Sequence, residues 1–155
     1  MKKITPREMK WINKGKYRNL GYNRIEAKGN NSYFYAISNE DFTFKSNHYL
    51  NNKDYSIYIS ISDITYIKLN FNDDLSITTS IKGYKVETSI DKNNYINLDN
   101  IIISINRVND NFEILVNEST ILKTNLPAAK DAVTFGFLFN NEHFVKIDNI
   151  QYIKK

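Results

Sequence analysis

The acidic side chains of this sequence lack the spacing that hydrolysis of a sugar chain requires. Glycoside hydrolases use two carboxylates, about 5–5.5 Å apart in retaining enzymes and further apart in inverting ones. Alternate residues of a strand share one face, so a pair on a strand needs a pattern such as Glu-x-Asp-x-x-Glu. Glu87 and Asp91 have Ser89 between them and no third acid, and the adjacent Glu40 and Asp41 would face opposite sides of a strand. We therefore expect no catalytic carboxylate pair.

The other groups that could perform chemistry are equally isolated. His48 and His143 are the only histidines; both lie in turn-like contexts, and His143 stands beside Glu142. The sequence contains no serine nucleophile elbow, no Walker loop and no paired histidine ligands. It also contains no cysteine, which excludes disulfides and thiolate metal sites. The sequence therefore predicts a protein that is not an enzyme, has no catalytic residue and needs no cofactor.

Aromatic and polar side chains at alternating positions are the candidates for binding. Aromatic rings can stack on the faces of sugar rings, while Asn, Lys and Glu side chains can form hydrogen bonds with hydroxyl groups. The predicted ligand contacts are Tyr58, Tyr66, Lys68, Asn70 and Glu87. A structural explanation stays open for the tyrosines, because outward-facing tyrosine is favoured in strands without any ligand.

Three further aromatic residues are weaker candidates. Trp11, the only tryptophan, is expected to pack on the rest of the protein as an N-terminal plug. Tyr33 and Tyr35 lie in a segment whose buried face the pattern does not determine. None of the three is included among the predicted contacts.

A period-two alternation of apolar and polar residues runs through most of the chain and predicts antiparallel strands. In "YSIYISIS" (55–62), isoleucine alternates with serine and tyrosine. The same pattern occurs at 65–71, 75–81, 84–90, 101–108, 112–117, 120–124 and 133–139. Turn-forming residues separate the strands at 72–74, 82–83, 91–94, 109–111 and 140–141. About ten to twelve strands of this kind predict an all-β, two-sheet antiparallel β-sandwich or a barrel.

The length and the N-terminal segment complete the predicted organisation. A chain of 155 residues can bury one core, so we expect a single domain over residues 1–155. Only "TPREMKWI" (5–12) favours a short helix, with Thr5 as the N-cap and Pro6 in the first turn. The short connection between 55–62 and 65–71 predicts that these two strands form a hairpin.

Three motifs near the C-terminus narrow the fold class. They are a hydrophobic strand with a turn at Val116-Asn117-Glu118-Ser119, the segment Phe135-Gly136-Phe137, and the segment Ile147-Asp148-Asn149-Ile150. This succession resembles the end of concanavalin A-like jelly-roll domains, the superfamily of laminin-G modules, legume-type lectins and laminarinase-type glycoside hydrolases. Glu118 departs from the pattern, since glycine is usual in that turn. The resemblance covers mainly residues 95–153 and implies a jelly-roll sandwich with a lectin-like role.

The last of these motifs interrupts the alternation of the final strand. Ile147 and Ile150 are three residues apart, so strict alternation would place them on opposite faces. A β-bulge at Asp148 and Asn149 would turn both isoleucines into the core, and short Asx side chains can satisfy the backbone groups that a bulge frees. The resemblance offers an alternative, because other jelly rolls hold a structural calcium with an Asp in this strand. Calcium needs six to eight oxygen ligands, and Asp148 alone supplies few.

Charge and hydropathy limit the classes of partner. The net charge is +4, the lysines are scattered, and no Lys/Arg-rich run indicates nucleic-acid binding. No apolar run approaches the roughly 20 residues that span a bilayer, and the N-terminus has no signal-peptide pattern. We expect a cytoplasmic protein unless the chain was excised from an exported one. The abundance of Asn, Ile, Lys and Tyr is typical of an AT-rich genome.

Two functions remain after these exclusions. The first is a non-catalytic carbohydrate-binding module, whose partner is an oligosaccharide or glycan. The second is a structural or assembly sandwich, such as a virion decoration, fibre or subunit-docking domain. A homo-oligomer or a protein partner stays open in both, and a glycoside hydrolase is the third alternative.

Overall fold

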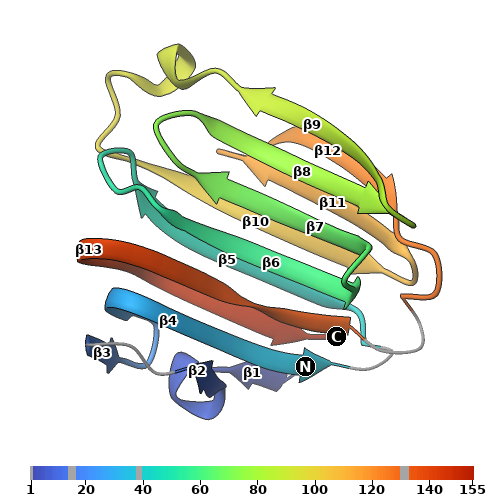
Figure 1. Ribbon diagram of the computed structural model, residues 1–155, viewed down its shortest axis with the longest axis horizontal. Coiled ribbons are helices and arrows are strands. Elements are labelled where there is room, and N and C mark those ends of the chain that lie inside the picture. The colour runs from blue at the N-terminus through green and yellow to red at the C-terminus, as the bar shows by residue number, and fades with distance from the viewer. Residues whose placement is uncertain (1, 14–16, 38–39, 130–132) are drawn as a thin grey trace.

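The computed structural model of the chain describes residues 2–13, 17–37, 40–129 and 133–155, and it describes their side chains except at 2, 13 and 33–37. The described residues form thirteen strands (Figure 1). The strands are β1 (Lys2–Ile4), β2 (Lys10–Asn13), β3 (Tyr17–Leu20), β4 (Ile25–Ile37), β5 (Phe42–Tyr49), β6 (Tyr55–Ser62), β7 (Thr65–Phe71), β8 (Leu75–Ile81), β9 (Tyr84–Ile90), β10 (Asn100–Val108), β11 (Asn111–Val116), β12 (Ser119–Asn125) and β13 (Val133–Lys154). Two 3₁₀ turns, η1 (Pro6–Glu8) and η2 (Lys92–Tyr95), are the helical elements of this part of the chain. None of the described helices is long and apolar enough to cross a membrane.

The strands form two layers that share the long strand β13. The hydrogen-bonded order is β12-β11-β10-β5-β13-β6-β7-β8-β9, and every pairing is antiparallel. Residues 134–139 of β13 pair with β6, and residues 147–154 pair with β5. We call β6–β9 with the first half of β13 sheet I, and β5 and β10–β12 with the second half of β13 sheet II; Figure 1 shows one sheet lying over the other. The architecture confirms the predicted all-β, two-sheet jelly-roll sandwich.

The core lies between the two sheets and is rich in phenylalanine. Phe44 of β5 and Phe135 of β13 come from opposite sheets, and their ring centroids are 4.7 Å apart. Phe42 also reaches Phe135, at 6.1 Å. Isoleucines on the inner positions of β6, β7, β10 and β11 fill the remaining space and are buried, except Ile61 at the end of β6, which is partly buried. The predicted alternation therefore assigns the inner faces of these strands correctly.

The predicted bulge near the C-terminus is confirmed. Ile147 and Ile150 are both fully buried, although they are three residues apart. The register of β13 against β5 shifts between Asp148 and Gln151, and Asn149 has a positive φ of 50°. The extra residue thus turns Ile150 back to the core, and asparagine tolerates this left-handed conformation better than most residues.

The predicted turn at Asn140 and Asn141 is wrong. Strand β13 continues through these residues and bends from sheet I to sheet II, with a register shift against β4 between Asn141 and Val145. The Asn141 side chain accepts a hydrogen bond from the His143 backbone and donates one to the Lys53 carbonyl. The Asx chemistry that resembled a hairpin turn therefore supports a bulge at the corner of the sandwich.

The predicted N-terminal helix is reduced to a single 3₁₀ turn. The backbone nitrogen of Glu8 donates to the carbonyl of Thr5, and the Thr5 hydroxyl contacts the Glu8 carboxylate, so the capping residues act as expected. The chain then leaves the turn because β2 pairs with β4, and this pairing prevails over the helical preference of residues 5–12. Trp11 packs on the core with its ring 6.2 Å from Phe139, as the plug prediction requires.

Candidate functional site

The predicted ligand contacts all lie on the outer face of sheet I. Strand pairing places three rows of residues across β13, β6, β7, β8 and β9. The central row is Gly136, Tyr58, Lys68, Thr78 and Glu87. The flanking rows are Leu138, Ser56, Asn70, Ser76 and Ser89, and Thr134, Ser60, Tyr66, Ser80 and Lys85. We call these fifteen positions the polar face, because serine, threonine and charged residues dominate it.

Tyr58 and Tyr66 form a pair on this face. Strands β6 and β7 are hairpin neighbours as predicted, and the two tyrosines lie on a diagonal of the hairpin. Their ring centroids are 5.4 Å apart, and the ring planes are tilted by 38°. Both side chains are half-buried, so each ring packs against its neighbours on one side and is exposed to solvent on the other. Small serine side chains at Ser60 and Ser80 flank Tyr66 on the adjacent strands.

Lys68 and Asn70 line an open hollow of about 650 Å³ beside the tyrosine pair. Lys68 is directly opposite Tyr58 in the β6–β7 register, so the hollow adjoins the aromatic pair. The Asn70 amide nitrogen donates to the hydroxyl groups of Ser76 and Thr78, at 3.3 and 3.0 Å. These bonds fix the side chain across β7 and β8 and leave its carbonyl oxygen out of the network. Asn70 can therefore present a pre-positioned acceptor to a ligand.

Glu87 shares the polar face but lies away from this hollow. Thr78 stands between Lys68 and Glu87 in the central row. Glu87 instead lines a neighbouring open hollow of about 900 Å³, together with Asp73 and Asp91 at the ends of β7 and β9. The structure thus places Lys68 and Asn70 in the lining of the first hollow, Tyr58 and Tyr66 beside it, and the fifth predicted contact at the far edge of the same face.

Several residues that line the hollow were not predicted from the sequence. They are Asn30, Ser32, Asp54, Ser56, Asn72, Leu138 and Asn140, together with the buried core residues Tyr55 and Phe139. Ser56 could have been found, because it alternates with the buried isoleucines of β6. Asn30 and Ser32 come from β4, which pairs with β13, and Asn140 comes from β13, which pairs with β6 of the hairpin; both pairings are long-range and leave no local signal. The side chains of the weaker candidates Tyr33 and Tyr35 lie outside the described part of the structure.

The hollow carries hydrogen-bonding groups but lacks a hydrolytic pair among the described residues. Asp54 is the single carboxylate and Lys68 the single cation in its described lining. Hydrolysis by the two-carboxylate mechanism would need a second acid within about 5–10 Å of the first. The arrangement can bind hydroxyl groups and an apolar ring face, and its formal charges balance.

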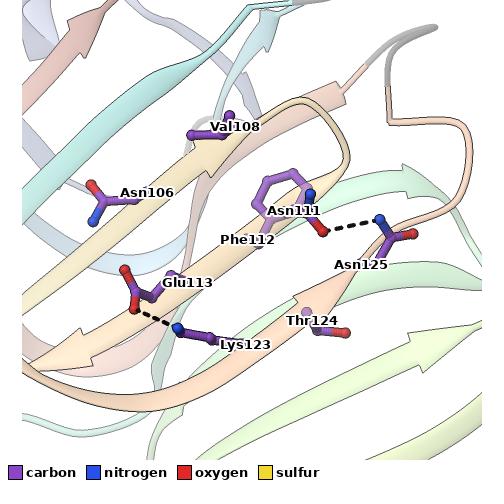
Figure 2. A pocket seen from close by; sticks show the side chains of 8 residues that line it. All are labelled: Asn106, Val108, Asn111, Phe112, Glu113, Lys123, Thr124 and Asn125. Atoms are coloured by element: carbon purple, nitrogen blue, oxygen red, sulfur yellow. Dashed lines mark hydrogen bonds and ion pairs between the residues drawn. The ribbon is translucent and has the colours of Figure 1, made fainter.

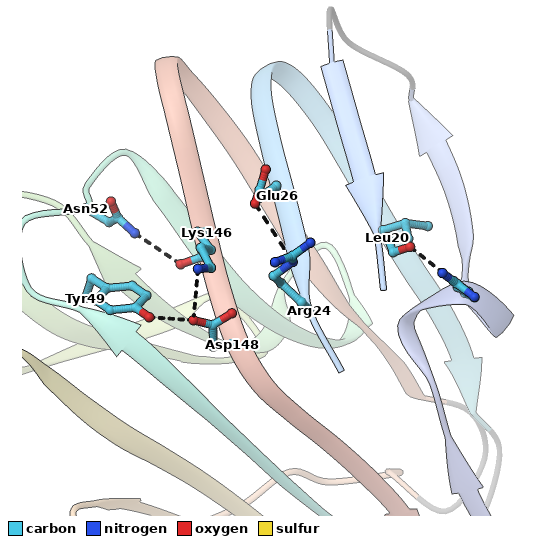
Figure 3. Close-up of polar contacts among 8 residues, drawn as sticks. Leu20, Arg24, Glu26, Tyr49, Asn52, Lys146 and Asp148 are labelled. Carbon is cyan, nitrogen blue, oxygen red and sulfur yellow. Dashed lines mark hydrogen bonds and ion pairs between the residues drawn. The ribbon is translucent and has the colours of Figure 1, made fainter. Parts of the chain in front are cut away.

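The environment of Asp148 does not fit calcium. Its carboxylate accepts a hydrogen bond from the Tyr49 hydroxyl and lies 3.5 Å from the ammonium of Lys146 (Figure 3). The hydrogen bond to Asp148 and partial burial raise the pKa of Tyr49, so Tyr49 remains a donor. In the described part of the chain, no group of three or more His, Cys, Asp and Glu side chains could hold a metal ion. A cation and a hydroxyl donor therefore already contact one oxygen, Oδ2, of the carboxylate that calcium would need.

A third hollow, of about 460 Å³, lies on the outer face of sheet II (Figure 2). Its polar side chains bond mainly with one another: the Asn125 amide donates to Asn111 at 3.2 Å, and Lys123 lies 3.9 Å from Glu113. The half-exposed Val108 completes the surface. Because these groups already satisfy each other, this hollow offers a ligand fewer open partners than the polar face does.

The prediction for His48 is wrong, because this residue belongs to the core. It lies in strand β5 rather than in a turn, is fully buried, and contacts the hydroxyl groups of Ser46 and Tyr55. Burial lowers the pKa of His48 from 6.5 to about 3, so the ring is neutral at physiological pH. His143 is exposed and lies in β13, also outside a turn. Neither histidine reaches the polar face.

Comparisons with known proteins identify the fold. No protein-family model matches the chain, and no curated protein sequence matches it. A functionally unknown protein from Saccharomyces cerevisiae has a similar structure, with a TM-score of 0.72 and 10% identity over 98% of this chain and 99% of that one. A prokaryotic β-1,3-1,4-glucanase (lichenase) from a mouse hindgut metagenome follows, with a TM-score of 0.61 and 7% identity over 93% of this chain and 91% of that one.

A third similar structure is the CBM2 module of the evolved Dit of Lactobacillus casei BL23 phage J-1. Its TM-score is 0.56, with 10% identity over 89% of this chain and 78% of that one. At such low identities these likenesses establish the fold and leave function to the site itself. The chain is therefore an all-β jelly-roll sandwich whose fold agrees with the concanavalin A-like resemblance of its C-terminal motifs.

Proposed function

We propose that the chain is a non-catalytic carbohydrate-binding module that holds a glycan on the polar face of sheet I. The observation that carries the proposal is the pair of half-buried tyrosines, Tyr58 and Tyr66, 5.4 Å apart beside a polar hollow. A sugar ring has apolar C–H faces and a rim of hydroxyl groups. Two tyrosines supply both kinds of complement, because each has an aromatic face and a hydroxyl.

The lining of the hollow supports a neutral ligand. Lys68 contributes donors, while the Asn70 carbonyl and the Ser56 hydroxyl contribute acceptors next to the rings. The charges of Lys68 and Asp54 cancel, so the described lining has no excess charge to attract an anion or a cation. We therefore propose a neutral oligosaccharide as the ligand class.

Fold analogy supports glycan recognition, and the lack of an acid pair in the described lining of the hollow favours binding over hydrolysis. A jelly-roll neighbour with a TM-score of 0.61 is a β-1,3-1,4-glucanase, so the fold is compatible with glycan recognition. The single described carboxylate of the hollow, Asp54, leaves the two-carboxylate mechanism without its second member.

A glycan array with the purified chain and one variant tests the proposal. Tyr66→Ala should weaken binding of any positive glycan by about 1–2 kcal/mol, roughly five- to thirty-fold. It should leave the melting temperature nearly unchanged, because the ring lies on an outer face. Tyr22→Ala is the matched control: Tyr22 is 72% exposed, stacks under Arg7 and lies outside sheet I.

Three results would overturn the proposal. The first is an array on which the folded wild type binds no glycan. The second is a glycan that binds wild type and Tyr66→Ala equally well. The third is unfolding of Tyr66→Ala, which would make the ring a structural element.

A further inference from the structure

Strand β9 is an edge strand with an uncovered inner face. It ends the strand order of sheet I, so one side of its backbone has no partner strand among the described residues. Its residues that point between the sheets include Tyr84 and Val86, which are 76% and 49% exposed. They border a small opening of about 180 Å³ at the rim of the sandwich, where Leu122 of sheet II lies opposite. Open edges with apolar side chains favour pairing with another strand.

The turn before β9 determines which backbone groups face outward. Lys82 and Gly83 have φ values of 50° and 89°, and they connect the opposed residues Ile81 and Tyr84. Two central residues with positive φ make a type I′ hairpin, in which the closing pair is hydrogen-bonded. Hydrogen-bonded positions alternate along an antiparallel strand. Even-numbered residues of β9 therefore bond to β8, and the odd-numbered Lys85, Glu87 and Ser89 direct their N–H and C=O groups away from the sheet.

The charges on the outward positions are self-complementary. Lys85 and Glu87 face the uncharged Ser80 and Thr78 across the β8 ladder, and no ion pair involving them is present in the described part of the chain. When two copies of β9 pair antiparallel about Val86, Lys85 of each copy lies opposite Glu87 of the other. Pairing about Lys85 or about Glu87 would place like charges opposite each other. The sequence of the strand thus favours one symmetric register.

We propose that β9 pairs with β9 of a second copy of this chain and forms a two-fold symmetric dimer. In this register Val86 lies opposite Val86 of the partner subunit, and Tyr84 lies opposite Thr88 of the partner subunit. Lys85 of each copy exchanges backbone hydrogen bonds with Glu87 of the other, and sheet I continues from one subunit into the next. The same contact brings the exposed Tyr84 and Val86 side chains against those of the second strand.

Edge charges usually oppose such pairing, and here they permit it in one register. A lysine on an edge strand blocks association when it meets an uncharged or cationic edge. Lys85 and Glu87 have opposite signs and stand two residues apart, so both side chains lie on the same face of β9. Each therefore meets its opposite in the symmetric pair, and directly opposed charges of unlike sign stabilise a strand pair.

Charge reversal with a mass measurement tests the proposal. Sedimentation velocity over roughly 1–500 μM should show a concentration-dependent dimer of the wild type. Lys85→Glu or Glu87→Lys turns the two Lys–Glu pairs between the subunits into two pairs of like charge. Either variant should raise the dissociation constant of the dimer about tenfold or more. The double variant restores the unlike pairs and should restore the dimer. Lys123→Glu on the other edge strand, β12, is the control of equal charge change and should leave the mass unchanged.

A single cysteine tests the register directly. Opposed residues at a non-hydrogen-bonded position have Cα atoms about 4.5 Å apart, which a disulfide can span. The chain has no cysteine of its own, so Val86→Cys should yield one covalent dimer under mild oxidation. Val108→Cys is the matched control, because Val108 is 50% exposed and lies on sheet II. Thr88→Cys should also stay monomeric, since the register separates the two copies of this residue.

The outcomes separate clearly. A monomer over the whole concentration range overturns the proposal, as does a dimer that resists both charge reversals. Cross-linking of Val86→Cys at the rate of Val108→Cys overturns the register. Circular dichroism of each variant confirms that it folds. Because all readouts are of mass, the result is independent of whether the polar face binds a glycan.

Discussion

The imidazole ring of His48 lies parallel to the ring of Phe71, with centroids 4.4 Å apart and planes inclined by 11°. Tyr55 also stacks on this phenylalanine, with its ring 4.5 Å from that of Phe71 and its hydroxyl 2.9 Å from His48 Nδ1. Ser46 provides the partner of the second ring nitrogen. The core thus contains a neutral histidine whose two nitrogens are both satisfied by hydroxyl groups.

This arrangement predicts that acid destabilises the protein through His48. The folded pKa is lowered to about 3 from 6.5 because burial penalises the charged ring. The unfolded state therefore binds a proton that the folded state does not accept, and stability is full above pH 6.5 and falls as the pH drops towards about 3. The loss should approach about 1.4 kcal/mol per pH unit in this window.

Urea unfolding at several pH values measures this effect. His48→Gln should reduce the slope of unfolding free energy against pH between 6.5 and 4. The reduction should approach about 1.4 kcal/mol per pH unit, which corresponds to one proton. His143→Gln is the control, since that side chain is exposed, and it should retain the wild-type slope. Equal slopes for wild type and His48→Gln would contradict the prediction.

The bulge in β13 predicts that glycine at position 149 gives a more stable protein than alanine does. A φ of 50° raises the free energy of the folded state by roughly 1 kcal/mol for most residues with a Cβ. The increase is smaller for asparagine and for glycine. Asn149→Ala should therefore lower the unfolding free energy by about 1 kcal/mol, whereas Asn149→Gly should stay close to the wild type. Gln151→Ala, at an exposed position beyond the bulge, should have little effect. If Asn149→Ala and Asn149→Gly were equally stable, the left-handed conformation would be wrong.

The inner faces of both sheets predict severe effects of buried charge. Ile147 and Phe137 are fully buried, in the two halves of β13. Replacing either with Asp puts an unpaired carboxylate in the core and should abolish folding, since the cost of several kcal/mol rivals a typical stability of 5–15 kcal/mol. Circular dichroism of the wild type should be β-dominated, and the variants should lose the cooperative melt. A soluble, cooperatively melting Ile147→Asp variant would show that the strand faces are assigned wrongly.

Local pairing explains which parts of the fold could be predicted from the sequence. The outward positions of β6 and β7 were assigned correctly because the strands form a hairpin and their alternation is unbroken. His48 was missed because Ser46 and Asn47 resemble a turn, yet the alternation of Phe42 and Phe44 continues through positions 46 and 48. A polar residue at an inner position breaks the hydrophobic pattern without breaking the strand.

Contacts between distant segments explain what the sequence could not determine. Asn140 was expected in a turn, and instead it lines the hollow, because β13 must cross from one sheet to the other. The alternation at 84–90 sets Tyr84 and Val86 against Lys85 and Glu87, and the register directs Tyr84 and Val86 to the inner face, but they remain exposed. Alternation gives the direction of a side chain, whereas its burial depends on how far the opposite sheet extends.

A substitution at Lys68 tests which groups make up the proposed glycan site. Lys68 lies opposite Tyr58 and lines the hollow, so Lys68→Met keeps the unbranched stem and removes the donors. Binding of a glycan that responds to Tyr66→Ala should weaken by about 1 kcal/mol, close to fivefold, because a half-exposed charged donor contributes less than a buried one. The unfolding free energy should change by less than about 0.5 kcal/mol. Lys123→Met on sheet II is the control, and titration calorimetry measures both; unchanged affinity of Lys68→Met would place the ligand away from the hollow.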